Sequence, residues 1–124
     1  HEVGAVDSIA DIIAIAVAAD DLAPDGVVVS DLPCGYGTVR CQHGLIPVPA
    51  PATAFIAEAA GLTLSPVDVE GELVTPTGAA AAAALRTEAA LPGRFSIKAI
   101  GMGAGKRAYD TPGILRAMII EPAE

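Results

Sequence analysis

A run of six alanines at residues 79–84, directly after Thr75-Pro76-Thr77-Gly78, constrains the fold more than any other segment of the chain. Alanine has the highest intrinsic helix propensity, threonine is a common N-cap residue, and proline is accommodated in the first helical turn. Together these residues predict a helix over residues 77–89.

A second helix is predicted to begin at Pro51 and to end at Gly61. Pro47 and Pro49 favour an extended, polyproline-like approach to it, and Pro51 suits its first turn. Glycine is common just after the last helical residue because it adopts the left-handed conformation readily. The chain therefore enters this helix along a stiff segment.

A third helix is predicted near the start of the chain, running to about Asp20. Asp7 or Ser8 can cap its amino terminus, and Ser8 and Asp11 have the spacing of a capping box. The buried stripe of this helix is expected to consist of apolar residues at helical spacing: Ile9, Ile12, Ile13 and Ala16.

The other apolar segments are typical of strands. They predict strands over 27–29 and 38–42, one or two short strands within 66–74, and strands over 94–101 and 114–120 joined by a loop at 102–113. We therefore expect an α/β or α+β fold, with helices packed on a mixed β-sheet in a single layered domain over residues 1–124.

Composition narrows the class of partner. The chain has 124 residues, a net charge of -8 and a hydrophobic share of 52% that is rich in alanine, so a thin core of Val, Ile, Leu and Ala is expected. The negative net charge disfavours binding to the phosphate backbone of nucleic acid. The longest apolar run, residues 12–19, is too short to cross a bilayer, which excludes a membrane-spanning helix there. We expect a cytoplasmic protein with two reduced cysteines, although one disulfide between them stays an alternative.

The segment over residues 34–53 holds most of the chemistry. Cys41 and His43 are two apart in a predicted strand, so they are expected to project from the same face. Cys34 can join them only if Gly35 and Gly37 turn the chain back, because seven extended residues span roughly 23 Å. Thiolate and imidazole are ligands that suit nickel, but two cysteines buried as small hydrophobic side chains and a surface imidazole explain the same residues without a metal.

Four segments carry a resemblance to a known family: residues 1–12, which begin His-Glu-Val-Gly-Ala-Val-Asp, and residues 34–53, 72–80 and 103–107. In this order they resemble the nickel insertion proteins of the nickel-pincer nucleotide pathway, which mature the cofactor of lactate racemase. The resemblance implies a CTP-dependent enzyme that inserts nickel into pyridinium bis-thiocarboxylic acid mononucleotide, forming one nickel–carbon and two nickel–sulfur bonds.

The resemblance also implies a longer protein. Family members have a histidine-rich stretch upstream of the His-Glu-Val-Gly motif and a carboxy-terminal domain that binds CTP and a divalent cation. Residues 1–124 are thus expected to be a fragment of the amino-terminal half, inactive alone, with the carboxy-terminal domain, the mononucleotide substrate and a second copy of the chain as candidate partners. No residue is assigned as the catalytic base.

The candidate metal ligands combine the motif residues with the thiol and imidazole of residues 34–53: His1, Glu2, Asp7, Asp11, Cys41 and His43. Helix capping is the alternative role of Asp7 and Asp11. The candidate phosphate-binding residues lie at a helix start and in a glycine-rich segment: Thr75, Thr77, Gly103, Gly105, Lys106 and Arg107. The alternatives are plain capping and a glycine-rich turn, since the second segment matches neither the Walker nor the dinucleotide pattern.

Two rival functions stay open. A non-catalytic interaction module would use the same glycines and prolines as turn residues and would pack its apolar surface against another domain or subunit. A stand-alone nucleotide-binding protein would bind CTP through these residues alone.

Overall fold

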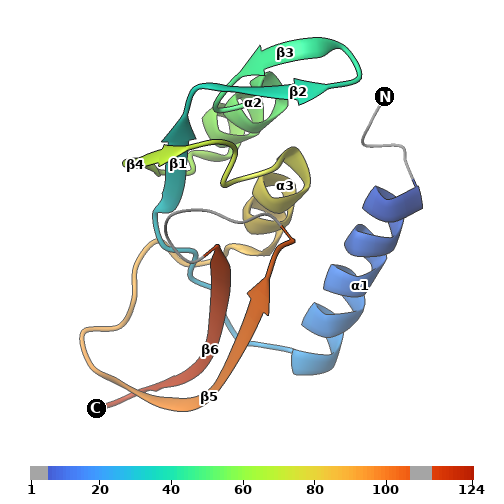
Figure 1. Cartoon of the computed structure of the whole chain (residues 1–124). Coiled ribbons are helices and arrows are strands. Elements are labelled where there is room, and N and C mark those ends of the chain that lie inside the picture. Colours follow the sequence, from blue (N-terminus) through green and yellow to red (C-terminus); the bar gives the residue numbers. More distant parts are fainter. Residues whose placement is uncertain (1–5, 107–112) are drawn as a thin grey trace. The chain divides into compact units, whose positions relative to one another are not determined.

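The computed structural model describes residues 6–106 and 113–124, which fall into two compact units, His1–Ala89 and Ala90–Glu124. The first unit contains all three helices: α1 (Val6–Leu22), α2 (Pro51–Ala60) and α3 (Pro76–Leu85). It also contains four strands: β1 (Leu32–Tyr36), β2 (Thr38–Cys41), β3 (Gly44–Pro47) and β4 (Leu64–Glu70). The second unit contains β5 (Phe95–Ala104) and β6 (Ile114–Pro122) (Figure 1).

The fold is mixed α/β, as the sequence predicts. Parallel and antiparallel pairing both occur, but the described strands form three two-stranded sheets, β1–β4, β2–β3 and β5–β6, where one continuous mixed sheet was expected. None of the helices in the described part of the chain has the length and hydropathy needed to cross a membrane.

Helix α3 begins as predicted and ends earlier. Thr75 is its N-cap, and the Thr75 hydroxyl accepts a hydrogen bond of 3.1 Å from the Gly78 amide. The helix stops at Leu85, and the predicted continuation to residue 89 is wrong, because the amides of Thr87 and Glu88 donate instead to the Val27 carbonyl. These long-range bonds compete with helical ones. The strand predicted at 27–29 is also wrong, because this segment forms only an isolated parallel bridge between Val28 and Glu88.

Helix α2 confirms the prediction at both ends. It starts at Pro51, and Gly61 closes it in the left-handed conformation, with φ of 65°. The Arg86 guanidinium donates hydrogen bonds to the carbonyls of Ala60 and Gly61. A cation at a helix carboxy terminus satisfies carbonyls that have no partner in the helix and complements the helix dipole. Arg86 thereby joins the end of α3 to the end of α2.

The parallel pair β1–β4 requires a very close approach at Gly35. A Cβ atom on Gly35 would lie 2.2 Å from the Gly71 carbonyl oxygen and 2.7 Å from that of Val69. The register between the two strands shifts at this point, between Cys34 and Tyr36. Only glycine fits a backbone approach of this kind. Gly35 therefore fixes how closely β1 lies against the chain around β4.

The buried core is small and is made of small side chains. Among the described residues it comprises Ala50, Thr53, Ala57, Val69 and Ala79, all from the first unit. The predicted core of Val, Ile, Leu and Ala is confirmed for alanine and valine only, because no isoleucine or leucine is buried among the described residues. Helices α2 and α3 pack on each other, and their buried residues are Thr53, Ala57 and Ala79. Helices that meet through alanine can approach closely.

Helix α1 is observed as predicted, but its predicted buried stripe is wrong. Ile9, Ile12, Ile13 and Ala16 are exposed, and no residue of α1 is buried. The main contact that α1 makes in the first unit is with α3. One helix neighbour can cover only one side of another helix, which leaves the remaining apolar side chains open.

Candidate functional site

Cys41 and His43 lie at the tip of the β2–β3 hairpin. Cys41 is the last residue of β2 and pairs with Gly44, and Gln42 and His43 form the turn between them. Gly44 has φ of 102°, which favours glycine and closes the turn. The prediction that Cys41 and His43 project from one strand face is therefore wrong, because the strand ends at Cys41. Cys41 at the end of β2 and His43 in the turn are separated by Gln42 alone, with His43 exposed and Cys41 half-buried.

Cys34 does not belong to this turn. It lies in β1, opposite Pro66 of β4, and Gly37, with φ of 92°, separates β1 from β2. Cys34 and Cys41 are not joined by a disulfide in the structure. Within residues 6–106 and 113–124, no three His, Cys, Asp or Glu side chains gather in a group that could hold a metal ion.

The other predicted metal ligands are on or before α1. Asp7 lies in the first turn of α1 and Asp11 one turn later, and both carboxylates are exposed. An acidic side chain in the first turn interacts favourably with the helix dipole, which is the capping alternative noted above. His1 and Glu2 lie outside the described residues, so the ligand set proposed for this part of the chain stays a prediction.

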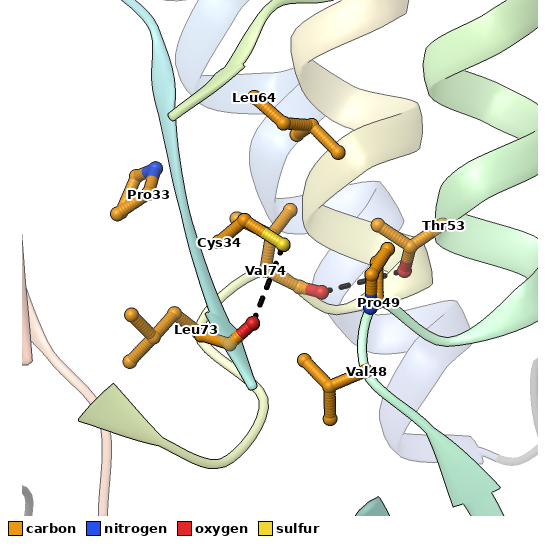
Figure 2. Close-up of a pocket in the computed structure, with 9 residues that line it drawn as sticks. Pro33, Cys34, Val48, Pro49, Thr53, Leu64, Leu73 and Val74 are labelled. Carbon is orange, nitrogen blue, oxygen red and sulfur yellow. Dashed lines mark hydrogen bonds between the residues drawn. The ribbon is translucent and has the colours of Figure 1, made fainter. Parts of the chain in front are cut away.

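A small hollow opens beside Cys34 in the first unit. Its walls are mostly apolar and come from β1, the segment before α2, α2 itself, the start of β4 and the segment after β4: Pro33, Cys34, Gly35, Val48, Pro49, Thr53, Leu64, Leu73 and Val74. Figure 2 shows the Cys34 thiol on the side of the hollow that faces Val74, where it donates weakly to the Gly35 carbonyl at 3.5 Å. The Thr53 hydroxyl donates to the Val74 carbonyl at 3.3 Å. Both polar groups thus have partners within the protein.

The threonines predicted to bind phosphate lie at the start of α3. The Thr75 hydroxyl is engaged as the N-cap, which confirms its capping role, and Thr77 is half-buried in the first helical turn. The backbone amides of a first helical turn point outward along the axis and favour an anion. This end of α3 is compatible with an anion, and binding there stays a prediction.

The glycine-rich segment is more ordered than predicted. Gly103 lies in β5, opposite Leu115, and the predicted loop therefore begins after Ala104. The Gly105 amide donates to the Gly113 carbonyl at 3.5 Å, and Lys106 is exposed. Amides in a strand ladder are directed at the partner strand, so a phosphate cradle in this unit would use Gly105 and Lys106 more than Gly103. Arg107 lies outside the described residues.

The family model described as "Nickel insertion protein" matches residues 1–124, which is the whole chain. The chain belongs to the nickel insertion protein family. The resemblance carried by the four sequence segments is thereby confirmed.

Curated relatives agree with the family. The chain is 55% identical over 121 residues to the pyridinium-3,5-bisthiocarboxylic acid mononucleotide nickel insertion protein of Alkaliphilus metalliredigens, covering 98% of this chain and 29% of the relative. It is 43% identical over 118 residues to the protein of the same name from Staphylococcus saprophyticus, covering 95% of this chain and 30% of that one. The comparison with solved structures found no match.

The chain thus spans less than a third of the length of these nickel insertion proteins. Their names state that they insert nickel and that the substrate is a mononucleotide. The family membership says nothing by itself about which of the described residues contact either one.

The sequence analysis missed two side chains that tie elements of the first unit together, one of them in the wall of the hollow. Thr53 is 1% exposed and ties α2 to the segment after β4, and Arg86 ties α3 to the end of α2. A polar residue among the alanines of a predicted helix was the available signal for Thr53. Nothing local signals the role of Arg86, because its partners are 25 and 26 residues away.

Proposed function

We propose that residues 1–124 form part of an enzyme that inserts nickel into pyridinium bis-thiocarboxylic acid mononucleotide. The whole-chain match to the nickel insertion protein family carries this proposal. The proposed setting is cytoplasmic and CTP-dependent, with CTP and its divalent cation bound by a carboxy-terminal domain, and the product is the nickel-pincer nucleotide cofactor of lactate racemase.

In this proposal nickel is a substrate, and its ligands must be able to release it. Cys41 and His43 offer one sulfur and one nitrogen donor at an exposed turn. Such donors suit a divalent metal of the nickel type, whereas oxygen-rich sites suit magnesium or calcium. With only two protein ligands, the nickel ion keeps open coordination positions for the sulfur atoms of the substrate. Such a site favours transfer of nickel to the substrate over tight retention by the protein.

The reaction replaces a carbon–hydrogen bond of the pyridinium ring by a nickel–carbon bond and releases the proton. Two nickel–sulfur bonds form to the thiocarboxylates. The described residues identify no base for that proton, and the assignment of a catalytic residue is left out of the proposal. Asp7, Asp11, His1 and Glu2 are proposed to help position the metal.

The phosphate of the mononucleotide is proposed to bind the candidate residues of the two units. The start of α3 offers Thr75 and Thr77, and Gly103 in β5 is followed in the sequence by Gly105, Lys106 and Arg107, the last of which lies outside the described residues. Backbone amides and lysine or arginine side chains are the groups that commonly hold phosphate. The two sets belong to different units, and each is a separate candidate.

The test is nickel insertion by the full-length protein carrying His43→Ala or Cys41→Ala, with Gln42→Ala as the matched control from the same turn. We expect the first two variants to lose nickel affinity by about tenfold or more, in line with the loss of one metal ligand, and Gln42→Ala to change it little. Isothermal titration with nickel separates binding from turnover. Normal nickel binding and insertion in both variants would contradict the role of the hairpin tip.

A non-catalytic role is the second candidate function. It is favoured by the lack of a group of three potential ligands among the described residues and by the exposed apolar residues of α1, which suit an interaction module. This role predicts that the His43 and Cys41 variants insert nickel at the normal rate. It also predicts that variants of the exposed apolar side chains impair assembly of the full-length protein.

A further inference from the structure

The β2–β3 hairpin has one half-buried face and one exposed face. In β2, Val39 and Cys41 are half-buried, and β3 alternates in the same way. Thr38 and Arg40 lie between them on the opposite face of β2 and are exposed. Arg40 pairs with Leu45 of β3, which is 62% exposed. A cation and an apolar side chain thus lie opposite each other on the exposed face, one residue before Cys41.

Positive charge is scarce in the first unit. Residues 1–89 contain twelve Asp and Glu residues, no lysine and only two arginines, Arg40 and Arg86. The Arg86 guanidinium already donates to the carbonyls of Ala60 and Gly61. Arg40 makes no hydrogen bond or ion pair with any residue that the structure describes. For an anion bound by this unit, Arg40 is therefore the arginine whose guanidinium has all its donors available.

The proposed function, on which this inference rests, brings two anionic groups to the same hairpin. Nickel held by Cys41 and His43 is to form bonds to the sulfur atoms of both thiocarboxylates, so these groups must lie at the hairpin tip. Each thiocarboxylate carries a negative charge, and the acidic residues of the first unit oppose its approach. A cation beside the tip would offset that repulsion.

We infer that Arg40 binds the thiocarboxylate oxygen atoms of the mononucleotide, while the sulfur atoms turn toward the nickel. The planar guanidinium presents its N–H donors as a fork, which matches a planar carboxylate-type group. The Cα atoms of Arg40 and Cys41 are about 3.8 Å apart, as for any neighbouring residues, and the three-carbon stem lets the guanidinium extend to the turn. Leu45 offers an apolar contact to the flat pyridinium ring. Arg40 is thus a substrate-binding residue and takes no part in proton transfer.

The test is isothermal titration of the full-length protein with the metal-free substrate mononucleotide. We expect Arg40→Gln to raise the Kd by about tenfold or more, since it removes hydrogen bonds between two charged groups. Arg40→Lys keeps the charge without the fork and should restore only part of the affinity. Arg116→Gln is the matched control, because it removes the same charge from an exposed position in the second unit and should change the Kd little. Nickel affinity, titrated separately, should stay unchanged in Arg40→Gln.

A second ligand identifies the group that Arg40 contacts. The same mononucleotide without its two thiocarboxylates should bind the wild-type protein and Arg40→Gln equally. An equal loss of affinity for both ligands in Arg40→Gln would place Arg40 on the phosphate and overturn the inference.

Three further results would also contradict the role of Arg40. Unchanged substrate affinity in Arg40→Gln would remove the inference alone and leave the proposed function in place. A parallel loss of nickel affinity would show that the substitution disturbs the hairpin tip itself. If the wild-type protein bound no mononucleotide, the proposed function would fail together with the inference.

Discussion

The packed layer of the first unit and the β5–β6 pair of the second unit use apolar residues in opposite ways. Around α2 and α3, Ala79 is 0% exposed, so small side chains suffice to exclude water. In the β5–β6 pair, Leu115 is 75% exposed and Met102 73%, and neither strand has a buried residue. Residue size alone therefore does not create a core. What distinguishes the two regions is whether the unit supplies a second layer of its own, as α2 and α3 do for each other in the first unit.

The comparison also explains which region can be stable alone. A two-stranded antiparallel pair has marginal stability in water unless another layer covers it. The packed layer has such cover, because α2 and α3 pack on each other and Arg86 and Thr53 add long-range hydrogen bonds. Substitutions should consequently cost more free energy in the packed layer than in the β5–β6 pair.

The largest effect is expected for Gly35→Ala. The new Cβ would collide with the backbone carbonyls of Gly71 and Val69, which cannot move without disrupting the β1–β4 pair. We expect the free energy of opening of β4 to fall by about 3 kcal/mol or more, measured by native-state hydrogen exchange of the full-length protein. Gly101→Ala in β5 is the control, because its Cβ would meet nothing within 4 Å and should cost less than about 0.5 kcal/mol. Equal losses of opening free energy for Gly35→Ala and Gly101→Ala would contradict the expectation that substitutions cost more in the packed layer than in the β5–β6 pair.

A smaller effect is expected for Thr53→Val. Valine keeps the shape of the side chain but cannot donate to the Val74 carbonyl, so that partly buried carbonyl loses its partner. The expected loss is about 1–2 kcal/mol in the opening free energy of α2, again by hydrogen exchange. Thr63→Val, at an exposed position, serves as the control and should change little. An unchanged α2 in the Thr53 variant would mean that the hydroxyl contributes nothing to the packed layer.

A comparable or slightly smaller effect is expected for Thr75→Ala. The substitution removes the acceptor of the Gly78 amide and should weaken α3 by about 1 kcal/mol. Thr75→Ser retains the hydroxyl and should restore most of the loss, as measured by exchange of the first α3 amides. If serine failed to restore it, the cap would not be the source of the effect.

The smallest effect is expected for Lys98→Met in the β5–β6 pair. The Lys98 ammonium lies 3.5 Å from the Glu121 carboxylate, and both side chains are more than half exposed. Exposed ion pairs contribute little, so the change in opening free energy of β5 should be less than about 0.5 kcal/mol. A loss of 1 kcal/mol or more would require a stronger electrostatic contribution in this unit than solvent-screened pairs provide.

Local signals in the sequence predicted the elements that they directly encode. Pro51 and Gly61 bound α2, and Thr75 caps α3, because caps and proline positions act within one helical turn. The sequence could not predict where hydrogen bonds and contacts to distant parts of the chain end a helix or bury its side chains. The end of α3 depends on Val27, some 60 residues away, and the exposure of α1 depends on which elements lie beside it.

The sequence also predicted the candidate functional site only in part. The pattern placed Cys41 and His43 on one strand, whereas the strand ends at Cys41 and His43 lies in the turn, because alternation says nothing about where a hairpin turns. Gly44 was the local signal for that turn, since glycine there has positive φ. The motif residues His1, Glu2 and Arg107 lie outside the described residues, and their roles stay predictions.

The parallel pairing of β1 and β4 has a consequence for how this family can vary. Parallel strands must be joined by a crossover, and here the crossover contains both the β2–β3 hairpin and α2. The β2–β3 hairpin thus lies within the crossover between β1 and β4, and the positions of β1 and β4 are set by their own pairing. The tip can lengthen, shorten or change in sequence without shifting the register of β1 on β4, so the nickel-binding role proposed for Cys41 and His43 could be altered while the scaffold stays the same.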